Sequence, residues 1–493
     1  MPLESVEAVL VPPADGPKLI PLEMATPVYA KPDEQAEKIG YLRIGARVAR
    51  SEDPVGFQDC SAGWYAVRPL GFVCTDEDAT LNVEHPLARA LSAEPDRARP
   101  MPYAYAFARA IAPNYVRIPT TEEQFDSELR LARHLRNWAK LGHAWDALTV
   151  GANDVPLGPD GLAKGPAPEQ PIPLDMNVRY GGSGNDAVPW WLEGSRQIPN
   201  IAAFDVAPEA LIANRIQRHA GVSLIGSFVA GDAAGARRFA ITPDARLLPA
   251  DKLKADSGSA FHGQNLREVG LPAAFVWRKG ARFWKAESGR FKSEAVIEPR
   301  QFVALTGEAR TLGDERWVEA RDGRWLRSAD LRVAVKPRSL PWFASKSRRW
   351  IDVSILNQIL VLWEGEDPVY ATLVSTGKDG LGDPETTTST PQGVFRILQK
   401  HVTTTMDSNA ADSEFELRDV PWVMYFKGGY ALHGAYWHDD FGRMRSHGCV
   451  NLAPIDARYV FEWSSPDVPQ HWHGAYASGG AGFGDGTILR IGR

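Results

Sequence analysis

Short stretches of alternating hydrophobic and polar residues open the chain. They run through TPVYAKPDEQAEKIGYLRIGARVARS (residues 26–51) and GWYAVRPLGFVCTDEDATL (63–81), punctuated by Gly, Pro and Asp. A period of two residues is typical of half-buried β-strands, and closely spaced turn residues favour a small β-barrel or sandwich. We therefore expect an all-β module over residues 20–90.

A similar pattern returns twice further along the chain. RRFAITPDARLLPADKLKA (237–255) and RWVEARDGRWLRSADLRVA (316–334) each combine an aromatic strand, a turn, a second strand and an Asp-x-Leu ending. This self-similarity predicts three copies of one module, over residues 20–90, 100–255 and 265–336. The pattern leaves open the alternative that short aromatic hairpins simply resemble one another.

A helix and an irregular stretch are expected between the first two copies. Thr120 and Glu123 form a capping box, after which one amphipathic helix is predicted from the spacing of Phe125, Leu129, Ala132, Leu135 and Ala139. Residues 146–200 are dense in Gly and Pro, so they predict an irregular excursion. Its Trp190 and Trp191 suit a carbohydrate surface or, more commonly, buried anchors.

The last part of the chain predicts a β-rich domain over residues 345–493. Two strand-like runs surround the turn at Glu364 and Gly365, and the segments TPQGVFRIL and YALHG continue the pattern. The fold class predicted for the whole chain is therefore mainly β.

Composition and charge exclude several classes of protein. Of the 493 residues, 44% are hydrophobic and 24% are charged, which is typical of a folded protein of several domains. Lys and Arg number 55 against 61 Asp and Glu, so the net charge of −6 does not favour nucleic-acid binding. No run of 18 apolar residues predicts a transmembrane helix. The first residues also lack the basic start of a signal peptide, which by itself favours the cytoplasm unless a targeting segment was removed.

The segment LHGAYWHDDFGRMRSHGCVN places four reactive side chains within 17 residues: His433, His438, His447 and Cys449. In one interpretation Cys449 is a nucleophile whose proton a histidine removes, and Gly448 allows a tight turn of N–H groups around an oxyanion. In a second interpretation the three histidines and Cys449 bind zinc, although their spacings of 5, 9 and 2 match no usual pattern of zinc ligands. In a third, Cys449 is a small buried hydrophobic residue.

These residues resemble the motif of the YkuD-type L,D-transpeptidases of bacterial peptidoglycan. The family has His-Gly or His-Ser, then Ser/Thr-His-Gly-Cys-aliphatic-Asn/Arg, and this chain has His433-Gly434 and Ser446-His447-Gly448-Cys449-Val450-Asn451. WIDVSILNQILVLWEG, STGKDG and STPQGVFRI resemble family segments in the same order. The resemblance covers residues 345–493 and implies a β-sandwich or barrel with short helices. The three upstream modules resemble bacterial SH3-like domains.

The resemblance implies a role for each motif residue. Cys449 would be the acylated nucleophile, His433 the general base, and the Gly434 carbonyl the group that orients the imidazole. N–H groups around Gly448 and Cys449 would form the oxyanion hole. The residues that would shape and brace this turn are Ser446, His447 and Asn451, the last at a position where many members carry Arg. No metal and no cofactor are implied.

The implied reaction joins peptidoglycan stem peptides. Cys449 would attack the carbonyl of the third residue of a donor tetrapeptide and expel D-alanine, and the side-chain amine of a diamino acid acceptor would then resolve the thioester into a 3→3 crosslink. Residues 401–430 would supply a lid. Candidates for substrate contact are Met406, Trp422, Tyr425, Trp437, Arg443, Arg445 and Asn451; the aromatic residues and Met406 could equally be core, and the arginines could equally be solvated.

Cys60 and Cys74 flank a predicted hairpin, so they would form either a disulfide or two reduced buried thiols. The resemblance favours the disulfide and a periplasmic or cell-wall location, because the substrate lies in an oxidising compartment. It also suggests that an export signal was removed, and that the SH3-like modules contact glycan. Two alternatives remain: an L,D-carboxypeptidase or wall-anchoring acyltransferase of the same family, and a wall-binding scaffold without catalysis.

Overall fold

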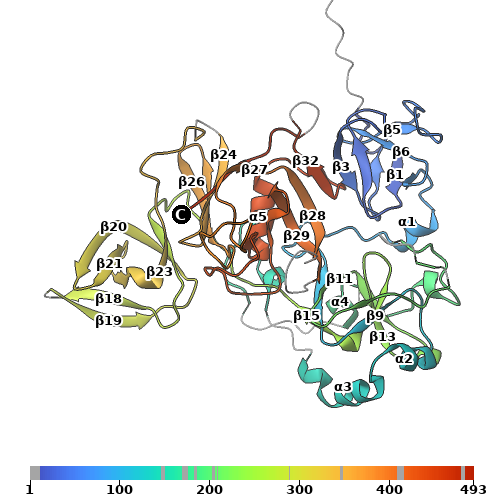
Figure 1. Cartoon of the computed structure of the whole chain (residues 1–493), viewed down its shortest axis with the longest axis horizontal. Coiled ribbons are helices and arrows are strands. Elements are labelled where there is room, and N and C mark those ends of the chain that lie inside the picture. The colour runs from blue at the N-terminus through green and yellow to red at the C-terminus, as the bar shows by residue number, and fades with distance from the viewer. Residues whose placement is uncertain are drawn as a thin grey trace, which may run out of the picture.

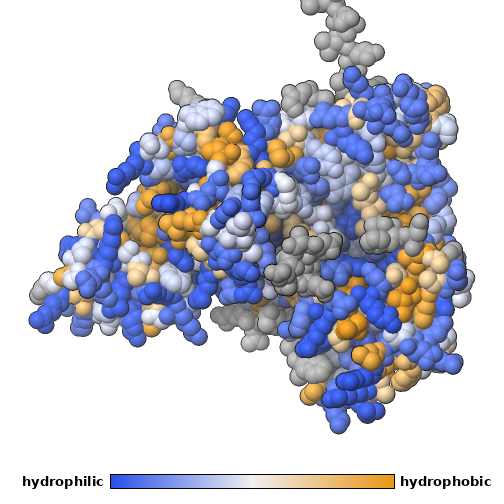
Figure 2. Space-filling model, viewed as in Figure 1, coloured by the Kyte–Doolittle hydropathy of each residue, from blue (hydrophilic) through white to orange (hydrophobic). Residues whose placement is uncertain are grey.

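The computed structural model describes residues 11–145, 150–168, 176–182, 186–201, 206–207, 209–287, 289–344, 348–407, 416–478 and 483–493. About 38% of the chain lies in strands and 11% in helices, which confirms the mainly β fold class. No helix in these ranges is long and apolar enough to cross a membrane. Hydrophilic residues cover most of the face seen in Figure 2, and the apolar ones form separate patches.

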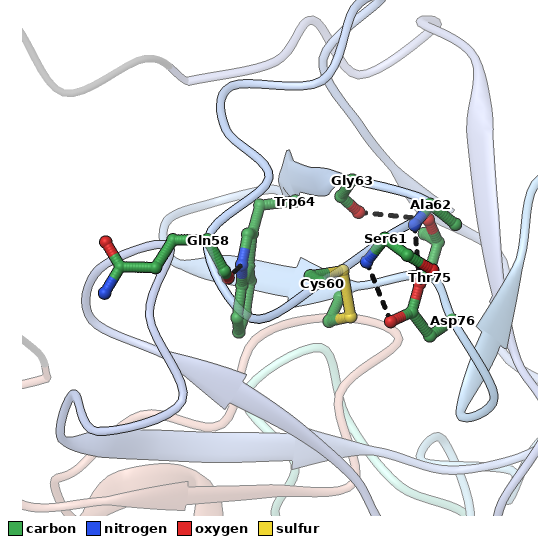
Figure 3. The surroundings of a disulfide bond; sticks show 9 residues. Gln58, Cys60, Ser61, Ala62, Gly63, Trp64, Thr75 and Asp76 are labelled. Carbon is green, nitrogen blue, oxygen red and sulfur yellow. Dashed lines mark hydrogen bonds between the residues drawn. A yellow bond between two sulfur atoms is a disulfide. The ribbon is translucent and has the colours of Figure 1, made fainter.

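The first module consists of seven short strands followed by one helical turn. The elements are β1 (Lys18–Pro21), β2 (Thr26–Tyr29), β3 (Lys38–Leu42), β4 (Val48–Ala49), β5 (Trp64–Ala66), β6 (Phe72–Cys74), β7 (Ala79–Thr80) and α1 (Pro86–Ala90). Cys60, in the loop before β5, and Cys74, at the end of β6, form a disulfide with their Cα atoms 5.9 Å apart (Figure 3). Beside it, the backbone N–H groups of Ser61 and Ala62 donate to the Asp76 carboxylate.

The second module contains eight strands and the helical insertion. The elements are β8 (Ala104–Ala108), β9 (Ala112–Tyr115), α2 (Thr121–Ser127), α3 (Leu131–Trp145), α4 (Met176–Arg179), β10 (Ile212–Ile216), β11 (Gly221–Leu224), β12 (Gly226–Val229), β13 (Arg238–Ile241), β14 (Leu247–Pro249) and β15 (Leu253–Asp256), with β16 (Gln264–Asn265) following it. Trp191 is buried and Trp190 packs against the same core, so both act as anchors.

The prediction of one helix after Thr120 is wrong in part. The capping box between Thr120 and Glu123 is present, but α2 ends at Ser127 and α3 begins four residues later. The break follows from Glu128, whose buried carboxylate pairs with Arg237 and Lys252. Arg130 then adopts a left-handed backbone conformation with φ of 57°. Two of the residues used for the predicted apolar face are consequently exposed, Phe125 and Leu129.

The third module forms one seven-stranded sheet that projects from the rest of the molecule (Figure 1). Its strands are β17 (Ala273–Val276), β18 (Arg282–Glu287), β19 (Arg290–Val296), β20 (Phe302–Leu312), β21 (Glu315–Ala320), β22 (Trp325–Arg327) and β23 (Leu331–Ala334). In the second and third modules a hairpin, a 3-10 turn and a last strand follow one another, with the turns at Ala250–Lys252 and Ser328–Asp330. This succession accounts for the sequence similarity; the SH3-like assignment stays a prediction.

In its described residues, the C-terminal domain contributes strands to two sheets and contains helix α5. Its elements are β24 (Arg349–Ser354), β25 (Ile359–Glu364), β26 (Asp367–Leu373), β27 (Gly393–Arg396), β28 (Gln399–Asp407), β29 (Glu416–Lys427), β30 (Tyr430–Gly434), β31 (Val450–Leu452), α5 (Pro454–Trp463), β32 (Gly474–Tyr476) and β33 (Ile488–Gly492). One sheet has the order β16-β26-β25-β24-β33-β27, and the other contains β28 to β32. Helix α5 packs on the second sheet, where Phe461 lies against Trp422 with ring centres 5.2 Å apart.

The second sheet continues into both of the first two modules (Figure 1). Strand β32 pairs with β3 of the first module, and β29 pairs with β11 of the second. The buried carboxylate of Asp419 on β29 fastens this arrangement. It accepts hydrogen bonds from Arg43 of the first module, Ser223 of the second and Thr403 of the neighbouring strand. The catalytic motif is therefore held in a sheet to which three parts of the chain contribute.

Candidate active site

Two adjacent parallel strands carry the two halves of the motif. His433 on β30 lies opposite Asn451 on β31, and Gly434 lies opposite Leu452. Paired residues point to the same face of a sheet, and so do residues two apart along a strand. The register therefore directs Ala431 and His433 toward one face, and Cys449 directly precedes β31, so the fold places the predicted base and the predicted nucleophile on neighbouring strands.

Cys449 is half-buried and not disulfide-bonded. Its Sγ lies 3.8 Å from the carbonyl oxygen of Gly429, to which the thiol donates. Burial raises the pKa of the Cys449 thiol to about 11, an effect that a hydrogen bond from the Ala431 backbone only partly offsets. At neutral pH the thiol is therefore protonated, and a base must remove its proton before it can attack a carbonyl.

His433 has the properties of such a base. Its ring is 2% exposed, and Nδ1 lies 3.3 Å from the carbonyl oxygen of Gly434. Because a carbonyl oxygen only accepts hydrogen bonds, Nδ1 carries the proton, and Nε2 keeps the lone pair that can receive one. Burial lowers the pKa of His433 to about 4, so the free imidazole is neutral at pH 7. The Gly434 carbonyl thus holds the ring in the tautomer that a general base requires.

A hydrogen-bonded turn precedes the nucleophile. Ser446 Oγ donates to the carbonyl oxygen of Cys449 over 2.5 Å and accepts from the backbone N–H of Gly448 over 3.1 Å. Gly448 has φ of 116°, and a Cβ there would lie 2.6 Å from the Tyr430 ring. Only glycine suits this position, and the resulting turn fixes the N–H groups that precede Cys449.

Asn451 braces the strand, and its contact with substrate stays a prediction. Its side chain is 3% exposed, with Nδ2 3.0 Å from Nε2 of His438, and its backbone exchanges two hydrogen bonds with Ser375. The sequence does not indicate the structural role of His438 as the partner of Asn451. The residues lie 13 positions apart, so no local pattern indicates their contact.

The zinc interpretation has no geometric support. In the described part of the chain, the one group of three or more ligand-type side chains close enough to share a metal ion is Cys60, Cys74 and Asp76. Two of its members are bonded to each other as a disulfide. The motif histidines and Cys449 form no such group, and His447 points its side chain to the exposed surface.

Three of the predicted cleft residues border the same hydrophobic cluster as Cys449. Met406, Tyr425 and Trp437 are partly buried and pack in the same hydrophobic cluster as Cys449, and the Trp437 ring lies 5.6 Å from that of His433. Trp422 is different: it is fully buried in the neighbouring core, and its Nε1 donates to Pro100. Of the two alternatives that the sequence leaves open for Trp422, the structure shows the core position.

The two predicted arginines already have partners in the free protein. The guanidinium of Arg443 lies 5.8 Å from the ring centre of Trp277 in the third module. Arg445 forms an ion pair with Asp440, and about half of its side chain is exposed. A contact between either arginine and a stem carboxylate stays a prediction.

Comparison with known proteins identifies this part of the chain. Residues 348–471 match the family model YkuD, described as the L,D-transpeptidase catalytic domain. The putative L,D-transpeptidase YciB of Bacillus subtilis (strain 168) is 25% identical over 148 residues, which span 25% of this chain and 62% of that relative.

Solved structures also match, among them the following two. The catalytic domain of an E. faecium L,D-transpeptidase is 22% identical and covers 30% of this chain and 98% of its own, with a TM-score of 0.23. L,D-transpeptidase 3 from Mycobacterium tuberculosis, in complex with a faropenem-derived adduct, is 17% identical and covers 38% and 79%, also with a TM-score of 0.23. The family model agrees with the register of β30 and β31 and with the environment of Cys449. Residues 348–471 are therefore a catalytic domain of the YkuD L,D-transpeptidase family.

Proposed function

We propose that the protein is an L,D-transpeptidase that forms 3→3 crosslinks between peptidoglycan stem peptides. The observation that carries the proposal is the buried, neutral His433, fixed by the Gly434 carbonyl one strand away from the half-buried thiol of Cys449. This arrangement supplies a base, a nucleophile and a preformed turn of N–H groups, which are the parts that acyl transfer requires.

In the first half of the reaction the Cys449 thiol passes its proton to Nε2 of His433. The sulfur attacks the carbonyl carbon of the third stem residue, and the N–H groups around Gly448 stabilise the negative oxygen. His433 then returns the proton to the leaving amine of D-alanine, and a thioester remains on Cys449. The pKa of the His433 imidazole lies below that of the Cys449 thiol, so the imidazole does not take the proton in the resting enzyme. The proton moves from the thiol to Nε2 as the oxyanion forms.

In the second half an amine of the acceptor stem attacks the thioester. His433 takes the amine proton, an amide bond forms, and the departing sulfur recovers a proton from the imidazole. If water replaces the amine, the same steps give an L,D-carboxypeptidase. We also propose a location outside the cytoplasm, which the disulfide between Cys60 and Cys74 supports.

Mass spectrometry of the products from a disaccharide-tetrapeptide tests the proposal. Crosslinked dimers that have lost D-alanine are expected from the wild type, and none from Cys449→Ala or His433→Ala. His471→Ala is the matched control, because this exposed histidine pairs with Glu94 away from the motif. Tripeptide without dimers would establish hydrolysis instead. Failure of a carbapenem to add its mass to Cys449 would favour the scaffold without catalysis.

A further inference from the structure

A groove of about 710 Å³ lies between the first module and the catalytic sheet. The first module contributes Tyr41 and Arg43, β28 contributes His401, and β32 contributes Tyr476. Figure 1 shows β3 and β32 side by side at this junction, with β28 next to them. None of these residues belongs to the reaction at Cys449.

The strand register places this groove on the same face as His433. Tyr41 lies opposite Gly474, which lies opposite His401, and Tyr476 lies opposite Gln399. Gln399 in turn lies opposite Tyr425, and Tyr425 lies opposite Ala431. Since opposed residues share a face, these residues lie on one face of the sheet, which runs from the first module to the strand that carries His433.

Aromatic contacts join the groove to the nucleophile along this face. The His401 ring lies 5.6 Å from Tyr41, 6.1 Å from Tyr476 and 5.5 Å from Tyr425, measured between ring centres. Tyr425 then packs in the cluster that contains Cys449. The row Tyr41, Tyr476, His401 and Tyr425 therefore forms a floor that ends at the active site.

A donor strand can connect the two sites if its sugar spans the part of the distance that its stem does not cover. From β31 to β28 there are three strand spacings, on the order of 14 Å at about 4.8 Å each. Three extended residues span roughly 10 Å. A donor whose third carbonyl lies at Cys449 and whose stem crosses the strands would thus place its sugar end at the groove.

The chemistry of the groove favours a sugar over a peptide. The backbones of β28, β32 and β3 are paired with one another, so no strand edge is open for an added peptide strand. The lining includes tyrosine rings, the hydroxyls of Thr404 and Thr405, and charged groups such as Lys38 and Asp78. Aromatic rings pack on the apolar faces of sugars, and hydroxyls bond sugar hydroxyls.

His401 gives an independent sign of a ligand. It is 9% exposed, and its Nδ1 lies 3.1 Å from the Tyr41 hydroxyl. Within the part of the chain that the structure describes, its Nε2 has no hydrogen-bond partner. A buried polar nitrogen without a partner is unfavourable unless a bound group satisfies it, and this nitrogen belongs to a residue of the groove wall.

We propose that this groove is a second subsite, which binds the N-acetylhexosamine disaccharide of the donor strand while its stem reaches Cys449. The identity of the donor rests on the proposed function. The groove would thereby make the first module part of the substrate site, and would favour donors still attached to glycan over free stem peptides.

Titration of the peptide-free disaccharide into the full chain tests the subsite without turnover. In a Cys449→Ala background, Tyr476→Ala is expected to weaken disaccharide binding about tenfold or more, and Tyr476→Phe to retain most of it. Trp342→Ala is the control, because Trp342 is an aromatic residue that is 87% exposed outside the groove. Circular dichroism verifies that each variant is folded.

The outcomes separate the subsite from the reaction. Equal disaccharide affinity in Tyr476→Ala and Trp342→Ala would overturn the proposal. So would a loss of affinity for the free tetrapeptide in Tyr476→Ala without loss for the disaccharide, because the groove would then hold peptide. If disaccharide binding depends on Tyr476 but the wild type neither crosslinks nor trims a disaccharide-tetrapeptide, the subsite stands and the proposed function fails.

Discussion

Removal of the Arg43 guanidinium should destabilise the sheet that carries the active site. Arg43 donates from Nη1 and Nη2 to the two carboxylate oxygens of Asp419, over 2.5 and 3.3 Å. Both side chains are less than a tenth exposed. In Arg43→Ala the Asp419 carboxylate would stay buried with hydrogen bonds from Ser223 and Thr403 but with no countercharge.

The expected loss is about 3–5 kcal/mol, the range for a buried ion pair that has lost one partner. For a cooperative unit of 150–250 residues, about 2–4 °C per kcal/mol then gives a decrease of roughly 6–20 °C in melting temperature. The loss should depend on pH. Arg43 holds the pKa of Asp419 well below its usual range, so the pair stabilises the fold above about pH 4 and progressively less as the pH falls.

Calorimetry of the full chain at pH 7 and at acidic pH measures this effect. Lys285→Ala is the control, since Lys285 and Glu287 form an exposed pair worth less than about 1 kcal/mol. The double variant Arg43→Met with Asp419→Leu should recover part of the loss, because it leaves no unpaired charge in the interior. A melting temperature for Arg43→Ala equal to that of Lys285→Ala would refute the assignment of Asp419 as a buried junction.

Three further changes have defined outcomes. Gly448→Ala should lower the rate of acylation by at least about 100-fold, because it removes the turn that forms the oxyanion hole. Gly428→Ala is the control, since Gly428 also has a positive φ but lies in open space, and stopped-flow measurement of acylation compares the two variants. Alkylation of Cys449 by iodoacetamide should rise about tenfold per pH unit from pH 7 to 10, because burial raises its thiol pKa to about 11, and a plateau near pH 8.5 would contradict this. Cys74→Ala should cost about 3 kcal/mol for a loop of this length, and dithiothreitol should then shift the melting temperature of the wild type but not of the variant.

The catalytic motif could be predicted because its chemistry is local in the chain. Ser446 to Cys449 are consecutive, and their hydrogen bonds form within one turn. His433 lies on β30, which pairs with β31, the next strand along the chain. The two halves of the motif are therefore neighbours both in strand order and in the sheet. The contacts of Arg43 with Asp419 and of Asn451 with His438 are different: an isolated arginine or histidine in the sequence gives no indication of its partner, and only the packing of distant strands determines it.

For a strand that is buried on both sides, the sequence also could not predict the face of the sheet on which each side chain lies. Trp422, Val423, Met424 and Tyr425 form an apolar run in which the period of two is invisible. The pairing of Tyr425 with Gln399 decides the faces, and it sends Trp422 into the core and Tyr425 toward Cys449. Pairing between strands of different modules is a property of the fold, so a single sequence leaves such residues ambiguous.

The junction of the first module with the catalytic domain and the floor of the groove are built from the same atoms. Gly40 and Gly474 let β3 and β32 approach closely: a Cβ on Gly40 would lie 2.4 Å from the Gly474 carbonyl oxygen, and one on Gly474 would lie 2.3 Å from the Tyr41 ring. The Tyr41 ring therefore passes over Gly474 and reaches His401. A side chain at either glycine would both separate the two strands and displace Tyr41. Because docking of the module and formation of the groove cannot occur separately, the first module is a structural part of the catalytic face.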